Sequence, residues 1–76
     1  MLILYTKDNC VYCDKVKRVF EERRLTYEER NIKYPEFLKE AQDLKAKTMP
    51  FMYDTTANVA MGESDDIIDY ASEYAF

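Results

Sequence analysis

The sequence of 76 residues contains no histidine or tryptophan, a single glycine, two prolines and two cysteines. Long hydrophobic runs are also missing, because the apolar segment at residues 1–5 gives way to polar residues. That segment is far shorter than the roughly 18–20 apolar residues of a transmembrane helix or the roughly 7–15 of a secretory signal. Two cysteines three positions apart are also a poor framework for a small secreted protein. We therefore expect a cytoplasmic protein without membrane association.

The charge balance excludes one broad class of partner. Because the net charge is −4, binding to nucleic acid, which needs a basic surface to neutralise phosphates, is not expected. The hydrophobic fraction of 47% argues against disorder. At this length it predicts one small domain spanning residues 1–76.

Apolar spacing and turn residues predict the order β-α-β-α-β-β-α. The expected strands lie at 2–5, 25–32, 51–53 and 58–61, and the expected helices at 11–24, from Pro35 onward, and behind a cap at Ser64. The apolar helix stripes are Tyr12, Val16, Val19 and Phe20 (with Arg23), then Phe37, Leu38, Ala41 and Leu44, then Ile67, Ile68, Ala71 and Tyr74. This order predicts an α/β fold in which a four-stranded mixed sheet carries helices on both faces.

The two cysteines stand where a polar loop gives way to the first helix. The amide groups at a helix N-terminus stabilise a negative charge, so Cys10 should form a thiolate readily. Cys13 would lie one turn further, more shielded, and able to attack a mixed disulfide on Cys10. Lys7 and Lys15 could add positive potential. Such a pair in a βαβ context is typical of cytosolic redox proteins.

Three alternatives for the pair remain open at this point. The pair could form half of a metal site, but four Cys or His ligands are usual for structural zinc and a monomer cannot supply them. A dimeric metal or iron–sulfur binding module could supply four ligands from two cysteine pairs. A purely structural disulfide is possible, although a ring this short removes little entropy from the unfolded chain. The cysteines could also be ordinary buried residues, and the chain an interaction domain without turnover.

Three motifs in this order resemble those of the glutaredoxins, in the thioredoxin-fold superfamily. "YTKDNCVYC" is similar to the family's Y-[ST]-K-x-x-C-P-Y-C, "KTMP" to its R-T-V-P, and "GESDD" to its G-G/C-x-D segment. The likeness covers essentially the whole chain. Composition alone does not indicate whether Pro50, which begins the third expected strand, follows a cis peptide bond. The resemblance implies that it does and that Pro50 faces the cysteines.

The resemblance also implies an activity. The chain would be a monomeric, glutathione-dependent dithiol–disulfide oxidoreductase with Cys10 as nucleophile and Cys13 as resolving thiol. Its substrates would be protein disulfides or glutathione mixed disulfides, with ribonucleotide reductase as one candidate client. Glutathione would be the reductant rather than a bound prosthetic group, and no metal is expected.

The family further implies a groove that binds glutathione. Its residues in this chain would be Lys7, Tyr12, Lys47, Thr48, Met49, Pro50, Ser64 and Asp65. The lysines would meet the glycyl carboxylate, the backbone of Met49 the cysteinyl part, and Ser64 and Asp65 the γ-glutamyl end. In the plainer alternative, Ser64 and Asp65 only cap the last helix and Lys47 is only solvated.

Two residues depart from the family pattern. Val11 stands in place of the usual proline, and Glu63 replaces a small residue and adds negative charge beside the expected γ-glutamyl site. Val11 and "IKYPE" are also similar to the NrdH-type redoxins, which thioredoxin reductase reduces. Lys7, Tyr12 and Thr48 favour the glutathione-using branch. The lack of tryptophan argues against an ordinary thioredoxin, whose motif is W-C-G-P-C.

Overall fold

The computed structural model describes residues 1–74, and it has the element order that the sequence predicts. The elements are β1 (Leu2–Thr6), α1 (Val11–Glu22), β2 (Tyr27–Asn31), α2 (Pro35–Asp43), β3 (Phe51–Asp54), β4 (Val59–Met61) and α3 (Ser64–Ser72). Pro35 occupies the first turn of α2, where its missing N–H costs no hydrogen bond. None of the helices in these residues is long and apolar enough to cross a membrane.

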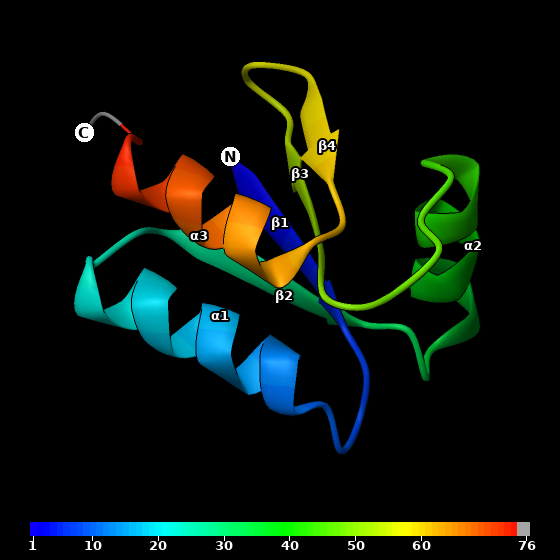
Figure 1. Ribbon diagram of the computed structural model, residues 1–76. Helices are drawn as coiled ribbons and strands as arrows, with labels where there is room; N and C mark the ends of the chain where they lie inside the picture. The colour runs from blue at the N-terminus through cyan, green and yellow to red at the C-terminus, as the bar shows by residue number, and fades with distance from the viewer. Residues whose placement is uncertain (75–76) are drawn as a thin grey trace.

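The four strands form one mixed sheet in the order β2-β1-β3-β4 (Figure 1). β1 is parallel to β2 and antiparallel to β3, and β3 is antiparallel to β4. β1 has a strand on each side and helices over both faces of the sheet, so all five of its residues are buried. The predicted mixed α/β sheet is therefore confirmed, and the carboxyl end of β1 points to one edge of the molecule.

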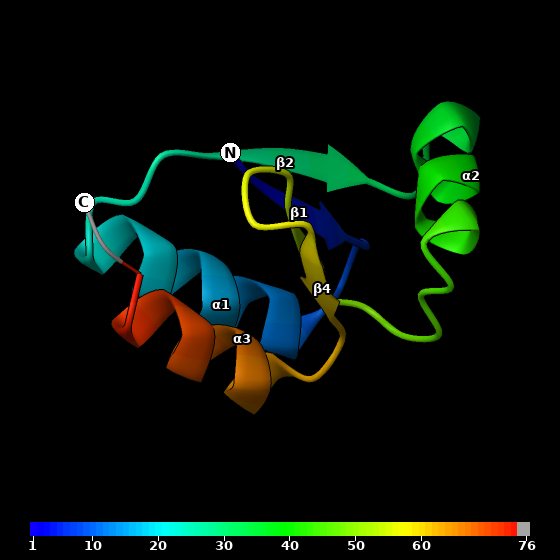
Figure 2. The ribbon, with the colours of Figure 1, turned by 90° about the horizontal axis from the view of Figure 1, so that it is seen from above.

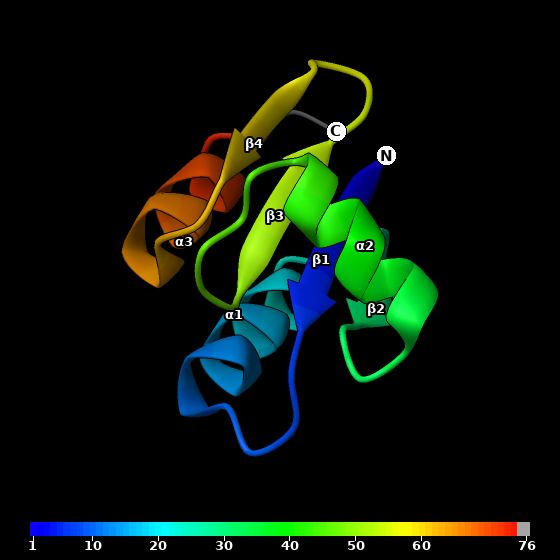
Figure 3. The same cartoon turned by 90° about the vertical axis from the view of Figure 1, so that its right-hand side faces the viewer.

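Helices cover both faces of the sheet, as predicted. α1 and α3 lie side by side on one face, and α2 lies alone on the other (Figures 2 and 3). Side chains alternate along β1, so Leu2 and Leu4 join the core under α1 and α3, whereas Ile3 and Tyr5 join the core under α2. This arrangement leaves the N-termini of α1 and α3 at the same edge as the carboxyl end of β1.

Two predicted helix ends differ from the structure by one or two residues. α1 ends at Glu22 rather than at residue 24, because Arg24 takes a left-handed conformation (φ 56°) that ends the helix. The N-cap of α3 is Glu63, in extended conformation, and Ser64 is already helical. Ser64 is therefore not the cap that the sequence predicted. Glu63 makes no capping hydrogen bond with its side chain.

Two residues of the predicted apolar stripes face solvent. Tyr12 is 62% exposed, because Cys13 occupies the inward position in the first turn of α1. Leu38 is 38% exposed, since α2 turns Ala41 toward the sheet. The remaining inward positions of α1, Val16 and Phe20, are fully buried.

Candidate active site at the cysteine pair

Cys10 and Cys13 form a disulfide at the start of α1, with their Cα atoms 5.2 Å apart. The loop that follows β1 reaches this point through Asn9, whose positive φ of 55° reverses the chain. Cys10 is the N-cap of α1, and Cys13 lies one turn inside the helix. Cys10 is 7% exposed and Cys13 only 1%, so Cys13 is the more shielded residue, as predicted.

The first turn of α1 is arranged to stabilise charge on the sulfur of Cys10. The backbone N–H of Cys13 donates a hydrogen bond to Cys10 Sγ at 3.1 Å. The remaining N–H groups of this turn point the same way and carry the positive end of the helix dipole. A thiolate on Cys10, once the disulfide is reduced, would have this amide as a ready hydrogen-bond donor.

The segment before β3 closes over the same sulfur. The Met49–Pro50 peptide bond is cis, as the glutaredoxin resemblance implied. The Met49 carbonyl oxygen lies 3.9 Å from Cys10 Sγ, although the two residues are 39 positions apart. In the disulfide this is a contact only, and in the reduced protein a Cys10 thiol could donate a hydrogen bond to that oxygen. Pro50 is buried beside it.

A groove of about 500 Å³ runs past this point. Its lining residues are Lys7, Tyr12, Thr48, Met49, Pro50, Gly62, Glu63, Ser64 and Asp65. Seven of the eight residues predicted for glutathione are thus brought together, and Lys47, which is exposed, is not among them. That these residues bind glutathione stays a prediction.

Gly62 and Glu63 also line the groove, although neither was among the residues predicted to bind glutathione. Both belong to the "GESDD" segment that carries the resemblance, and the sequence argument had placed the charge of Glu63 beside the expected γ-glutamyl site. Gly62 leaves room for its neighbours, because a Cβ there would lie 3.3 Å from the ring of Phe51. Glu63 brings a second carboxylate to the groove beside that of Asp65.

The surface around the disulfide is also partly apolar. Val11 is 77% exposed and Tyr12 is 62% exposed, and both begin α1 next to Cys10. Large apolar side chains at a helix start gain nothing from exposure to water. Of these two residues Tyr12 lines the groove, together with Met49 and Pro50, so the lining combines apolar side chains with the charged Lys7, Glu63 and Asp65.

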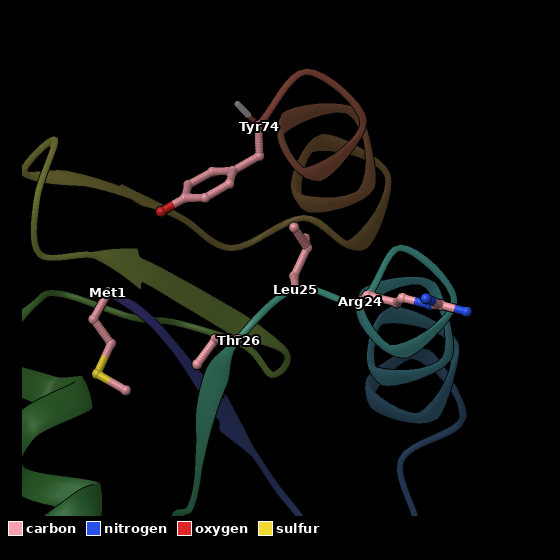
Figure 4. Close-up of a pocket in the computed structure, with 5 residues that line it drawn as sticks. All are labelled: Met1, Arg24, Leu25, Thr26 and Tyr74. Carbon is pink, nitrogen blue, oxygen red and sulfur yellow. The ribbon is translucent and has the colours of Figure 1, made fainter. Parts of the chain in front are cut away.

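A second cavity of about 360 Å³ lies at the other end of the sheet, beyond the carboxyl end of α1 (Figure 4). It is lined by Met1, Arg24, Leu25, Thr26 and Tyr74. The guanidinium of Arg24 is directed away from the other four side chains in this view. With no thiol, carboxylate or inward-pointing charge among its lining residues, this cavity offers no chemistry comparable to that of the cysteine pair.

Within residues 1–74, no cluster of three or more His, Cys, Asp or Glu side chains is placed to hold a metal ion. Cys10 and Cys13 are instead joined in a disulfide, which lies at the N-terminus of α1 and beside the groove. These are the elements of thiol–disulfide exchange.

Comparisons with known proteins agree with this fold. The model of the family "Glutathione S-transferase, N-terminal domain" matches residues 4–75. Among solved structures, a thioredoxin-like protein superposes with a TM-score of 0.77 at 16% identity, covering 93% of this chain and 99% of its own. The NrdH-redoxin of Escherichia coli gives 0.73 at 23% identity, covering 87% and 88%. The glutaredoxin of Brucella melitensis gives 0.68 at 24% identity, covering 95% and 78%.

A search among curated proteins found no match. The similar structures confirm the predicted thioredoxin-like, glutaredoxin-type fold. Since the family model spans nearly the whole sequence, the chain belongs to the family of glutathione S-transferase N-terminal domains.

Proposed function

We propose that the chain is a dithiol–disulfide oxidoreductase of the glutaredoxin type, with Cys10 as nucleophile and Cys13 as resolving thiol. The observation that carries the proposal is the Cys10–Cys13 disulfide at the N-terminus of α1, beside the groove and under the Met49 carbonyl. It acts as a monomer in a reducing compartment such as the cytoplasm, where the dithiol can be regenerated.

The reaction has two exchange steps. The Cys10 thiolate attacks one sulfur of a substrate disulfide, which forms a mixed disulfide and releases the other substrate sulfur as a thiolate. Cys13 then loses its proton and attacks Cys10 Sγ, which forms the Cys10–Cys13 disulfide and releases the second substrate thiolate. Two electrons pass to the substrate, and its two thiolates take up two protons. The 5.2 Å between the two Cα atoms suits this ring closure.

Glutathione is the proposed reductant that returns the disulfide to the dithiol. One glutathione thiolate attacks Cys10 Sγ, which breaks the Cys10–Cys13 bond and releases Cys13 as a thiolate. A second glutathione thiolate attacks the glutathione sulfur of this mixed disulfide, which releases Cys10 as a thiolate and forms glutathione disulfide. Lys7 would meet the glycyl carboxylate, Tyr12 would flank the peptide, and Ser64 and Asp65 would meet the γ-glutamyl end. The Met49 N–H has no hydrogen-bond partner among residues 1–74 and is available to the cysteinyl backbone.

A second candidate is a redoxin reduced by thioredoxin reductase, and Glu63 is the observation that favours it. Its carboxylate lines the groove where the γ-glutamyl carboxylate would lie. The similar Escherichia coli NrdH-redoxin is described as glutaredoxin-like with a thioredoxin-like activity profile. Under either candidate, client proteins carry a disulfide, and ribonucleotide reductase is one client to test.

The deciding experiment measures steady-state reduction of a small disulfide in two coupled assays. One contains NADPH, glutathione reductase and glutathione, and the other contains NADPH and thioredoxin reductase. We expect Cys10-dependent turnover with glutathione, and Cys10→Ser should abolish it. Cys13→Ser should still form the mixed disulfide on Cys10, seen by mass spectrometry, but lose reduction of protein disulfides. Turnover only with the reductase would replace glutathione by the second candidate, and no turnover in either assay would refute the redox function.

A further inference from the structure

The sheet places one positive and one negative side chain on opposite sides of the groove. Tyr5 of β1 pairs with Phe51 of β3, and Met52 of β3 pairs with Met61 of β4. The carboxyl ends of β1 and β4 therefore lie on either side of the start of β3. Lys7 follows β1 and Glu63 follows β4, and these two strands lie on either side of β3, about two strand spacings or roughly 10 Å apart.

Charges at the α3 end of the groove do not cancel. Asp65 is 3.7 Å from Lys15, but Glu63 has no ion pair within residues 1–74. A helix N-terminus by itself carries roughly half a positive charge and attracts anions. Here the carboxylates of Glu63, Asp65 and Asp66 outweigh that charge, even with Lys15 beside Asp65. The α3 end of the groove is therefore acidic, and the end at Lys7 is basic.

We propose that Glu63 is a specificity-determining residue, which makes the groove prefer disulfides flanked by a cationic residue over glutathione and other anionic disulfides. The substrate class is a cysteine-containing peptide segment with a lysine or arginine next to the cysteine. This inference rests on the proposed function, because it concerns which disulfide reaches Cys10.

The geometry gives the preference its direction. A cationic side chain near α3 meets Glu63, which no cation within residues 1–74 neutralises. A carboxylate at the same place is repelled by the negative charge of Glu63. Glutathione carries an α-carboxylate beside its ammonium group and so offers no net positive charge there. Both groove charges are exposed to solvent, so the effect should be moderate and should weaken with salt.

The test uses the single exchange step at Cys10 in a Cys13→Ser background. The probes are blocked peptides with one cysteine, activated as thiopyridyl disulfides, with lysine, glutamine or glutamate next to the cysteine. Attack by the Cys10 thiolate leaves the peptide on Cys10 and releases thiopyridone, whose absorbance gives the second-order rate constant. We expect the lysine probe to react about three- to tenfold faster than the glutamate probe at low ionic strength, and the ratio to approach one at high salt.

Variants assign this preference to one residue. Glu63→Gln should lower the ratio between the lysine and glutamate probes and speed the reaction of glutathionyl thiopyridyl disulfide by about two- to fivefold. Glu22→Gln removes an equal charge from the exposed carboxyl end of α1 and should leave both unchanged. Equal rates for the three probes, or an unchanged ratio in Glu63→Gln, would overturn the inference while Cys10 still reacts. No reaction above that of Cys10→Ser would instead refute the proposed function.

Discussion

Asp54 is a buried carboxylate at the end of β3, only 2% exposed. The Tyr70 hydroxyl donates to it at 2.7 Å and the Thr56 N–H at 3.1 Å. Burial by itself would raise the pKa of this carboxyl, but these hydrogen bonds and a further backbone one from Ala57 favour the charged form more strongly, so the net effect lowers the pKa. A buried charge of this kind is stabilising only while its donors remain in place.

Replacing Asp54 by asparagine should therefore destabilise the fold. Asp54→Asn puts an amide group where three hydrogen-bond donors face a carboxylate, and we expect a loss of about 1–3 kcal/mol in the free energy of unfolding. Urea unfolding measures it, with Asp69→Asn on the exposed face of α3 as the matched control. Because the folded pKa is lowered, the contribution of Asp54 is complete above the ordinary pKa of 3.8 and is lost as the pH falls further. Equal stability of the two variants at neutral pH would contradict this role.

Tyrosine hydroxyls join neighbouring elements on the face covered by α1 and α3. Tyr27 of β2 donates to Glu21 of α1 at 3.0 Å, and Tyr70 of α3 donates to Asp54 of β3. Burial and then the Glu21 carboxylate raise the pKa of Tyr27 to about 12. The hydrogen bond to Asp54, followed by burial, raises the pKa of Tyr70 to about 12. Each of these bonds exists only while the phenol keeps its proton.

Strong alkali should weaken the contacts of β2 with α1 and of α3 with β3, because it ionises the tyrosines that join them. The folded pKa values of Tyr27 and Tyr70 lie above the unfolded value of 10, so their stabilising contribution is complete below pH 10 and is lost as the pH rises toward 12. Tyrosinate absorbance should show two groups titrating near 12, and the urea midpoint should fall over the same interval. Tyr27→Phe and Tyr70→Phe should each remove one late-titrating group. Titration of every tyrosine near 10 in the folded protein would rule this out.

The whole molecule depends on a thin core on each side of one sheet. Leu4 is 0% exposed in the central strand, where Val16 and Met52 belong to the same cluster. At roughly 0.05–0.15 kcal/mol per residue, a chain of 76 residues has a free energy of unfolding of roughly 4–11 kcal/mol. A single cavity can therefore remove a large part of the total.

The same substitution, leucine to alanine, at a buried and at an exposed position tests how much each position contributes to the free energy of unfolding. Leu4→Ala should cost about 3–5 kcal/mol and leave little folded protein at moderate urea, because β1 is held between β2 and β3 and cannot move to fill the cavity. Leu38→Ala, at a position 38% exposed on α2, should change the free energy of unfolding by about 1 kcal/mol or less. Chemical denaturation of both reduced proteins makes the comparison. Similar losses at the two sites would mean that α2 carries more of the core than its burial indicates.

At the scale of elements, local pattern was enough for most of the fold. Alternating and helical apolar spacing predicted all seven elements in order, because each burial pattern repeats within a few residues. The same local logic located Cys10 at a helix start and Cys13 one turn inside it. Errors arose where neighbours compete for one inward position, as with Tyr12 and Cys13, or where backbone conformation sets the boundary, as with Ser64 and Glu63.

The sequence by itself thus determined the elements, the α/β class and the cysteine pair, since all three depend on residues close together in the chain. Only the tertiary structure brought Met49 against Cys10 from 39 residues away, and only strand pairing set Lys7 and Glu63 on opposite sides of the groove. The physical reason is that such contacts arise from the register of distant strands, which no local periodicity encodes. The family resemblance anticipated most of the residues that line the groove, but their arrangement around Cys10, and with it the charge that meets a substrate, is a property of the folded sheet.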